Sequence, residues 1–127
     1  MKRVVITGAT GFIGRRLLEQ VLRDGVNGES AHIVAIARHP ETLPPTLRDA
    51  VECHALDLAE APIEEIAAAC GQGALVFHLA ANASVDSGEA GYRHNVRGME
   101  RLLEALRGCA PTRVVYASSI GAVDRLP

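Results

Sequence analysis

The sequence predicts an α/β fold, a doubly wound parallel sheet of five strands in the order 3-2-1-4-5 with helices on both faces. The first observation behind this prediction is that short apolar runs, typical of buried strands, alternate with longer segments of helical periodicity. The second is a glycine-rich turn between the first strand and the first helix, Thr7-Gly-Ala-Thr-Gly-Phe-Ile-Gly14. Ligands of such sheets bind beyond the carboxyl ends of the strands, at the switch between strands one and four.

The first half of the chain supplies three strands. Residues 3–7 form a continuous apolar run, which indicates a buried strand, and the apolar positions of residues 12–23 fall on one helical face. Residues 32–37 form the second strand. Residues 38–50 contain three prolines, so we expect a loop with one helical turn at most. Residues 51–56 then form the third, short strand.

The second half adds two helices and two strands. Residues 62–70 form a helix that begins with a proline and stops at a glycine, and residues 74–80 form the fourth strand. A long helix covers residues 89–107, where apolar positions recur at helical spacing. Residues 113–118 form the fifth strand, and a loop follows. A sheet that ends there leaves one edge uncovered, so we expect association, for example a homodimer, or partial disorder near residues 119–127.

Composition narrows the function classes. The 127 residues make one domain, and a net charge of −2 gives no indication of nucleic-acid or membrane-surface binding. Cys53, Cys70 and Cys109 form no Cys-x-x-Cys pair, and the histidines have no metal-ligand spacing, so we expect no disulfide framework and no metal site. No apolar run approaches the roughly 20 residues that a membrane span requires. The first predicted strand begins at residue 3, so we expect no signal peptide. We therefore expect a cytoplasmic protein.

The glycine turn is the strongest functional signal. Gly8, Gly11 and Gly14 are spaced three apart, a variant of the dinucleotide-binding fingerprint. Without Cβ atoms, the first two let the backbone turn sharply and approach a pyrophosphate, and the third lets the helix pack closely on the strand. The helix N-terminus then faces the phosphates with its partial positive charge. The alternative is an ordinary tight turn.

The sequence resembles the extended branch of the short-chain dehydrogenase/reductase family, the NAD-dependent epimerase/dehydratases. The resemblance covers essentially the whole chain, and the matching pieces, in the family's order and spacing, are Thr7–Gly14, Asp57-Leu58, His78-Leu79-Ala80-Ala81, Asn95-Val96-Arg97-Gly98 and Tyr116-Ala117-Ser118-Ser119. The segment from Ser118 to Val123 also resembles dihydroflavonol and cinnamoyl reductases. The resemblance implies a Rossmann fold and hydride transfer between NAD(P) and a hydroxyl or carbonyl group, by an oxidoreductase or a sugar or sugar-nucleotide epimerase-dehydratase.

The resemblance also implies roles for residues in the cofactor site. The backbone of Phe12 and Ile13, between the glycines, would help to hold the pyrophosphate. Asp57 would accept a hydrogen bond from the adenine amino group, with the Leu58 backbone beside it; the alternative is a cap on the next helix. The small side chains of Ala80-Ala81 would leave room for the nicotinamide ribose.

Three residues are catalytic candidates by the same resemblance. Ser119, or Ser118 one position earlier, would bond the reacting oxygen of the substrate; alternatively, both hydroxyls satisfy turn backbone. Asn95 would match the structural asparagine that supports a proton relay, or would bond to helix backbone. His78, within a buried strand, is expected to be a packed core histidine.

One family feature is missing. The family uses a Tyr-x-x-x-Lys pair, but Lys2 is the only lysine here, and neither Tyr92 nor Tyr116 has a lysine four residues later. The family also continues with further strands and a smaller C-terminal substrate domain. We therefore expect residues 1–127 to be the N-terminal cofactor-binding part of a longer enzyme, inactive by itself. The alternatives are a non-catalytic NAD(P)-binding or sensing module and a structural relic.

The end of the second strand bears on which cofactor is used. NAD-binding members carry an acidic residue there, on the ribose 2′-hydroxyl. This sequence has Arg38-His39-Pro40 instead, with the nearest carboxylate at Glu41. Because a guanidinium matches a 2′-phosphate in charge and geometry, Arg38 favours NADP over NAD. The alternative is that Arg38 stacks on adenine or is solvated, and that NAD binds through backbone contacts.

Overall fold

The structure is a computed structural model that describes residues 1–80 and 88–117. Its elements are β1 (Lys2–Thr7), α1 (Phe12–Asp24), β2 (Ala31–Ala37), a 3₁₀ turn η1 (Pro40–Thr42), α2 (Pro45–Arg48), β3 (Glu52–Ala55), α3 (Ile63–Cys70), β4 (Leu75–His78), α4 (Gly88–Leu106) and β5 (Arg113–Tyr116).

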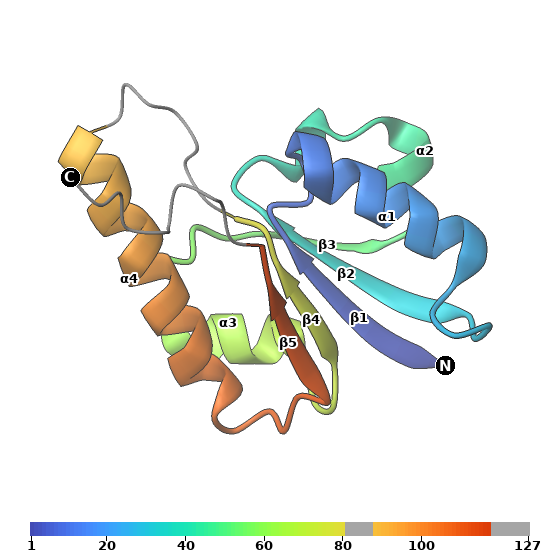
Figure 1. Ribbon diagram of the computed structural model, residues 1–127. Coiled ribbons are helices and arrows are strands. Elements are labelled where there is room, and N and C mark those ends of the chain that lie inside the picture. The colour runs from blue at the N-terminus through green and yellow to red at the C-terminus, as the bar shows by residue number, and fades with distance from the viewer. Residues whose placement is uncertain (81–87, 118–127) are drawn as a thin grey trace, which may run out of the picture.

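The sheet has the predicted topology. Its five strands lie in the order β3-β2-β1-β4-β5, and every neighbouring pair is parallel. β1 is central, with Val4 opposite Ile33 of β2 on one side and Leu75 of β4 on the other. Figure 1 shows α1 over one face and α3 and α4 over the other. The predicted doubly wound fold is confirmed.

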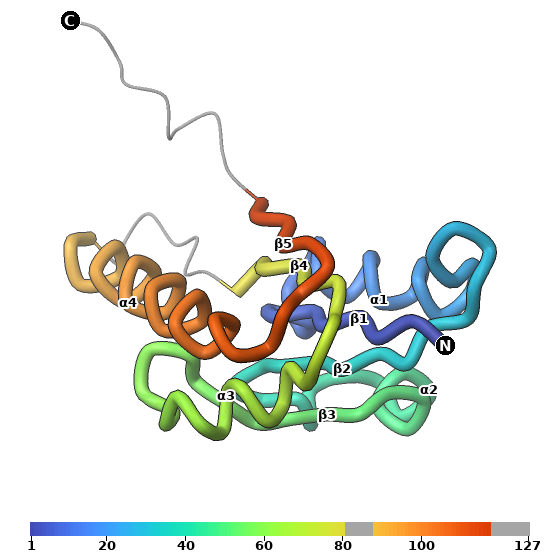
Figure 2. Tube along the Cα trace, turned by 90° about the horizontal axis from the view of Figure 1, so that it is seen from below, coloured from blue at the N-terminus to red at the C-terminus, as the bar shows by residue number. Residues whose placement is uncertain are grey.

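Each face of the sheet has its own core. Val4 and Ile6 of β1 pack on the α1 side, whereas Val5 packs with α3 and α4, and all three side chains are fully buried. Successive side chains of a strand point to opposite faces, so a strand covered on both faces must be apolar throughout. Figure 2, seen from below, shows α3 and α4 side by side and α1 apart from them.

The structure differs from the sequence prediction in detail. Residues 38–50 form two short helical turns, η1 and α2, instead of one. The strands β3, β4 and β5 are shorter than predicted, because the chain leaves the sheet after Ala55, His78 and Tyr116. In α4, Leu102 and Leu106 are buried but Leu103 is 45% exposed, so only part of its apolar pattern faces the core.

The three cysteines are free. No helix in the described part of the chain is long and apolar enough to cross a membrane. Ala81, Ser118 and Ser119, and the expected association or disorder near residues 119–127, lie outside the described residues. The expected homodimer stays a prediction.

Candidate functional site

A cavity of about 240 Å³ lies at the carboxyl ends of the strands. It is bordered by the glycine turn, the ends of β2, β3 and β4, and one face of α4. Seven of the predicted site residues line it: Gly8, Gly11, Arg38, Asp57, Leu58, Ala80 and Asn95. The remaining lining residues are Thr10, Ile36, Ala37, Leu56, Ala59, Leu79, His94 and Gly98.

The three glycines of the turn do different work. Gly8 has φ +68°, and a Cβ there would lie 2.7 Å from the Ala80 nitrogen, so only glycine fits between β1 and the end of β4. A Cβ on Gly14 would lie 2.0 Å from the Gly8 carbonyl oxygen, which confirms that this glycine lets α1 pack on the turn. Gly11 has an ordinary φ of −73°, and the nearest atom to its Cβ position is 3.3 Å away. Its missing side chain keeps the cavity open.

The N-terminus of α1 has the properties of an anion site. Gly11 is the N-cap, no side chain bonds to the cap, and the first turn carries no acidic residue. The side chains of Phe12 and Ile13 are 77% and 63% exposed, and the Phe12 ring lies 4.9 Å from the Arg16 guanidinium carbon. The backbone donors of this turn therefore meet no side-chain acceptor at the cap, and a phosphate fits both the open cradle and the helix dipole.

Thr7, which the sequence interpretation overlooked, joins β1 to β4 beneath the cavity. It is fully buried, and its Oγ1 accepts the N–H groups of Leu79 (3.0 Å) and Ala80 (3.1 Å). Since these bonds use both lone pairs, the hydroxyl donates its proton to His78 Nδ1 at 2.7 Å. The threonine thereby holds the end of β4 against the glycine turn.

His78 is the packed core histidine that the sequence predicted. It is 2% exposed, bonds to Thr7 and stacks on the ring of Tyr116 at a centroid distance of 5.7 Å. Burial lowers the pKa of His78, because the charged imidazolium would lose its hydration. The neutral ring then accepts the Thr7 proton at Nδ1.

Asp57 begins a turn that borders the other side of the cavity. Its Oδ1 accepts the N–H of Ala59 at 3.0 Å, and the Nε2 atom of His94 in α4 lies 3.3 Å from the same oxygen. The alternative that Asp57 caps the next helix is wrong in this form, because Pro62 occupies the N-cap of α3. Asp57 caps its own turn and keeps its carboxylate at the cavity wall.

Two arginines of α4 fasten the same turn. Arg97 Nε donates to the Ala59 carbonyl oxygen at 2.6 Å, and Arg101 donates to the carbonyl oxygen of Ala61. The sequence motif that includes Arg97 did not reveal this contact, because its partner lies 38 residues earlier in the chain.

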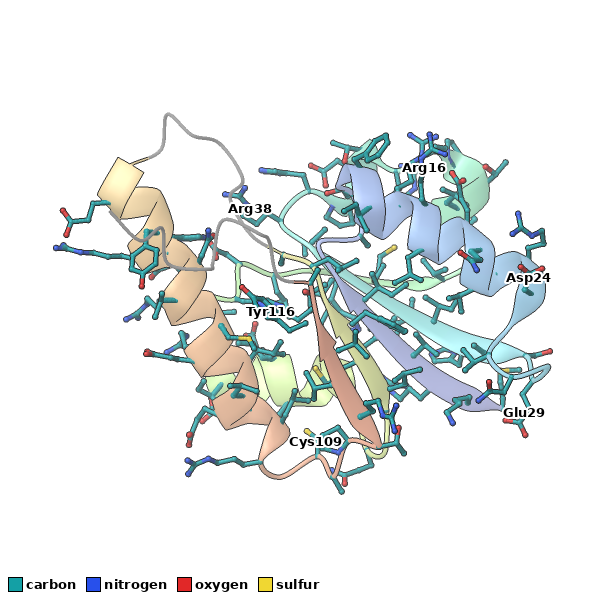
Figure 3. The ribbon with its side chains drawn as sticks, viewed as in Figure 1. Arg16, Asp24, Glu29, Arg38, Cys109 and Tyr116 are labelled. Carbon is teal, nitrogen blue, oxygen red and sulfur yellow. The ribbon has the colours of Figure 1, made fainter. Side chains whose placement is uncertain are left out.

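Arg38 and Glu41 lie at the end of β2 with different roles. Arg38 is exposed, lines the cavity and forms no hydrogen bond or ion pair within the described residues. Figure 3 shows its side chain at the end of the sheet opposite Asp24 and Glu29. The Glu41 carboxylate is instead engaged by His39 Nδ1 at 3.2 Å and does not line the cavity. The cationic group therefore borders the cavity and the nearest acid along the chain does not.

The chain is similar to known proteins over almost its whole length. The NAD dependent epimerase/dehydratase family matches residues 4–126. UDP-glucose 4-epimerase of Mycolicibacterium smegmatis is 32% identical over 98% of this chain and 41% of its own length. A solved UDP-galactose 4-epimerase superposes with a TM-score of 0.73 at 28% identity, over 93% of this chain and 38% of that one.

A second solved structure has its cofactor bound. Uronate dehydrogenase of Agrobacterium tumefaciens, in a Y136A variant complexed with NAD, superposes with a TM-score of 0.70 at 27% identity, over 94% of this chain and 41% of that one. The chain thus spans about two fifths of the length of these relatives.

Proposed function

We propose that this chain, which belongs to the NAD dependent epimerase/dehydratase family, binds a nicotinamide dinucleotide in the cavity at the carboxyl ends of its strands. In this proposal it is the cofactor-binding part of an enzyme that transfers a hydride to or from a hydroxyl or carbonyl carbon of a small molecule. The observation that carries the proposal is that the glycine turn, the uncapped start of α1 and the Asp57 turn meet in one cavity.

The residues of the chain bind and orient the cofactor. The backbone of the turn from Gly8 to Gly14 holds the pyrophosphate, Asp57 accepts the adenine amino group, and the small side chain of Ala80 leaves room for the nicotinamide ribose. The bound nicotinamide ring supplies the hydride acceptor or donor. By the family resemblance, Ala81 also leaves room for the ribose, Asn95 supports the proton relay, and Ser119 or Ser118 bonds the substrate oxygen.

The similar proteins support a sugar-derived substrate, because their names are UDP-glucose 4-epimerase, UDP-galactose 4-epimerase and uronate dehydrogenase. An epimerase returns the hydride to the same substrate, whereas a dehydrogenase keeps it on the cofactor. A lasting change in nicotinamide absorbance during turnover therefore distinguishes a dehydrogenase from an epimerase.

Gly11→Val tests the dinucleotide site. Gly11 lines the cavity and has a backbone conformation that any residue can adopt, so a valine adds bulk at the cavity wall, with its Cβ 3.3 Å from the Gly8 carbonyl oxygen. We expect NADPH affinity, measured by fluorescence titration of the purified protein, to fall by at least about tenfold. Gly108→Ala, with open space around its Cβ, is the control and keeps wild-type affinity. A wild-type protein that binds no dinucleotide, or a Gly11→Val variant with unchanged affinity, contradicts the proposal.

The finer proposal is that the cofactor is NADP. An unpaired guanidinium at the cavity supports it, as does the engagement of the Glu41 carboxylate by His39. Arg38→Asp should lower the ratio of NADP to NAD affinity by on the order of tenfold or more, because a carboxylate repels the 2′-phosphate. Arg113→Asp, on the opposite end of the sheet, should leave that ratio unchanged. A wild type that prefers NAD contradicts this choice.

The alternative is a non-catalytic NAD(P)-binding or sensing module, which the single lysine of residues 1–127 favours. Because the first proposal also expects residues 1–127 to be inactive by themselves, the test uses the longer protein that it requires: binding of the dinucleotide without conversion of any hydroxyl or carbonyl substrate from a panel of sugars and sugar nucleotides would support this alternative. Turnover would exclude it.

A further inference from the structure

Three nitrogen-bearing side chains of α4 form a row beside the turn at residues 57–61. His94, Arg97 and Arg101 are spaced three and four residues apart, which places them on one face of the helix. Each contacts a different point of the turn at residues 57–61: the Asp57 carboxylate, the Ala59 carbonyl and the Ala61 carbonyl. His94 is the only one of the three that lines the cavity.

The contacts of Asp57 leave its two carboxylate oxygens in different states. Oδ1 accepts the Ala59 N–H at 3.0 Å and lies 3.3 Å from His94 Nε2. No donor to Oδ2 is found in the described part of the chain. The side chains of His94 and Asp57 are 38% and 31% exposed, and both line the cavity. One hydrogen bond thus holds Oδ1, with His94 Nε2 beside it, while Oδ2 has no donor among the described residues.

A carboxylate held in this orientation distinguishes between the purine bases that a dinucleotide can carry. An ionised carboxylate only accepts hydrogen bonds, so it attracts the exocyclic amino group of adenine and repels the carbonyl oxygen that hypoxanthine carries at the same position. The selection depends on the carboxylate keeping its orientation, because a freely rotating group would turn to water. The Ala59 N–H anchors the carboxylate within its own turn, and His94 of α4 lies beside the same oxygen.

We propose that His94 is a positioning residue whose Nε2, placed 3.3 Å from Asp57 Oδ1, keeps that carboxylate oriented, so that the site binds an amino-bearing purine in preference to a carbonyl-bearing one. This inference rests on the proposed dinucleotide function. It assigns to α4 a part in reading the base, in addition to covering the sheet.

The test compares NADPH with its deaminated analogue, in which hypoxanthine replaces adenine, by titration of the purified protein. The wild type should bind NADPH on the order of tenfold more tightly than the analogue, which corresponds to one charge-assisted hydrogen bond. His94→Leu should reduce that ratio to about threefold or less, and His94→Gln, which keeps an N–H donor, should restore it. A merely structural role for His94 would weaken both ligands equally and leave the ratio unchanged.

His32→Leu is the matched control. His32 Nε2 lies 2.9 Å from a Glu52 carboxylate oxygen, in a histidine–carboxylate pair outside the cavity, so its loss should not alter the ratio. An unchanged ratio in His94→Leu, or a His94→Gln variant that behaves like His94→Leu, overturns the inference. Equal wild-type affinity for the two dinucleotides also overturns it but leaves the proposed function standing. A wild type that binds neither overturns the proposed function itself.

Discussion

The cavity is bordered by two turns that are built in different ways. The phosphate-side turn, residues 7–14, takes its shape from the main chain, because Gly8 and Gly14 leave no room for a Cβ against neighbouring backbone. The base-side turn, residues 57–61, is held by side chains that α4 extends from 37 to 40 residues further along the chain. The first turn is therefore shaped by close backbone contacts, within itself at Gly14 and with the end of β4 at Gly8, and the second depends on how the side chains of a docked helix reach it.

This difference predicts that the phosphate-side turn is the more sensitive to substitution. Gly14→Ala should have the largest effect, a loss of about 3 kcal/mol in the free energy of unfolding, because its methyl group would meet the Gly8 carbonyl oxygen at 2.0 Å. Urea denaturation measures the loss, and Gly108→Ala, with no atom within 4 Å of its Cβ position, provides the control. A loss below about 1 kcal/mol would show that the turn can move away from α1.

The Thr7 hydroxyl bonds the phosphate-side turn to the end of β4. Its removal should cause the next largest loss of stability. Thr7→Val keeps the shape but removes the partner of the buried His78 Nδ1 and of the half-buried Ala80 N–H, while the Leu79 N–H keeps its bond to the Thr7 carbonyl oxygen at 3.2 Å. We expect a loss of about 2 kcal/mol in the free energy of unfolding. Thr7→Ser should recover most of it. Thr112→Val, at an exposed position, should be nearly neutral, and an equal loss there would contradict the explanation.

Low pH should destabilise the folded protein by protonating His78, the partner of the Thr7 hydroxyl. Burial lowers the pKa of His78 in the folded protein below the ordinary value of 6.5, so the unfolded chain takes up the proton at higher pH than the folded one. This contribution to stability is complete above pH 6.5 and is lost as the pH falls toward the folded pKa, with a slope of at most about 1.4 kcal/mol per pH unit. His78→Gln should flatten this dependence of the free energy of unfolding on pH, measured by denaturation at a series of pH values.

Substitutions that affect the base-side turn should lower the free energy of unfolding least. Arg97→Met removes the hydrogen bond to the Ala59 carbonyl from a side chain that is 56% exposed, so we expect a loss of about 1 kcal/mol or less. Arg107→Met, whose guanidinium forms only a surface ion pair with Glu104 at 3.5 Å, should cost less still. A loss at Arg97 that equals the one at Gly14 would remove the distinction between the two turns.

Much of this site could be predicted because its signals are local. The βαβ alternation predicted the strand order, and the glycine spacing placed Gly8 and Gly11 at the cavity. Arg38 and Asp57 were found because each follows a strand directly, and the carboxyl ends of parallel strands share one edge of a sheet. The placement of Asn95 at the cavity came from family resemblance, and its role remains a prediction.

The sequence by itself determined the elements, their order and the glycine turn, because apolar periodicity and the absence of a Cβ act within a few residues. Only the tertiary structure decided that the Thr7 hydroxyl joins the end of β4 and that His94 and Arg97 meet the turn after Asp57. Those partners are 37 to 73 residues apart in the chain. Nothing in the local pattern of either partner specifies the other, because their distance is set by how the strands and α4 pack.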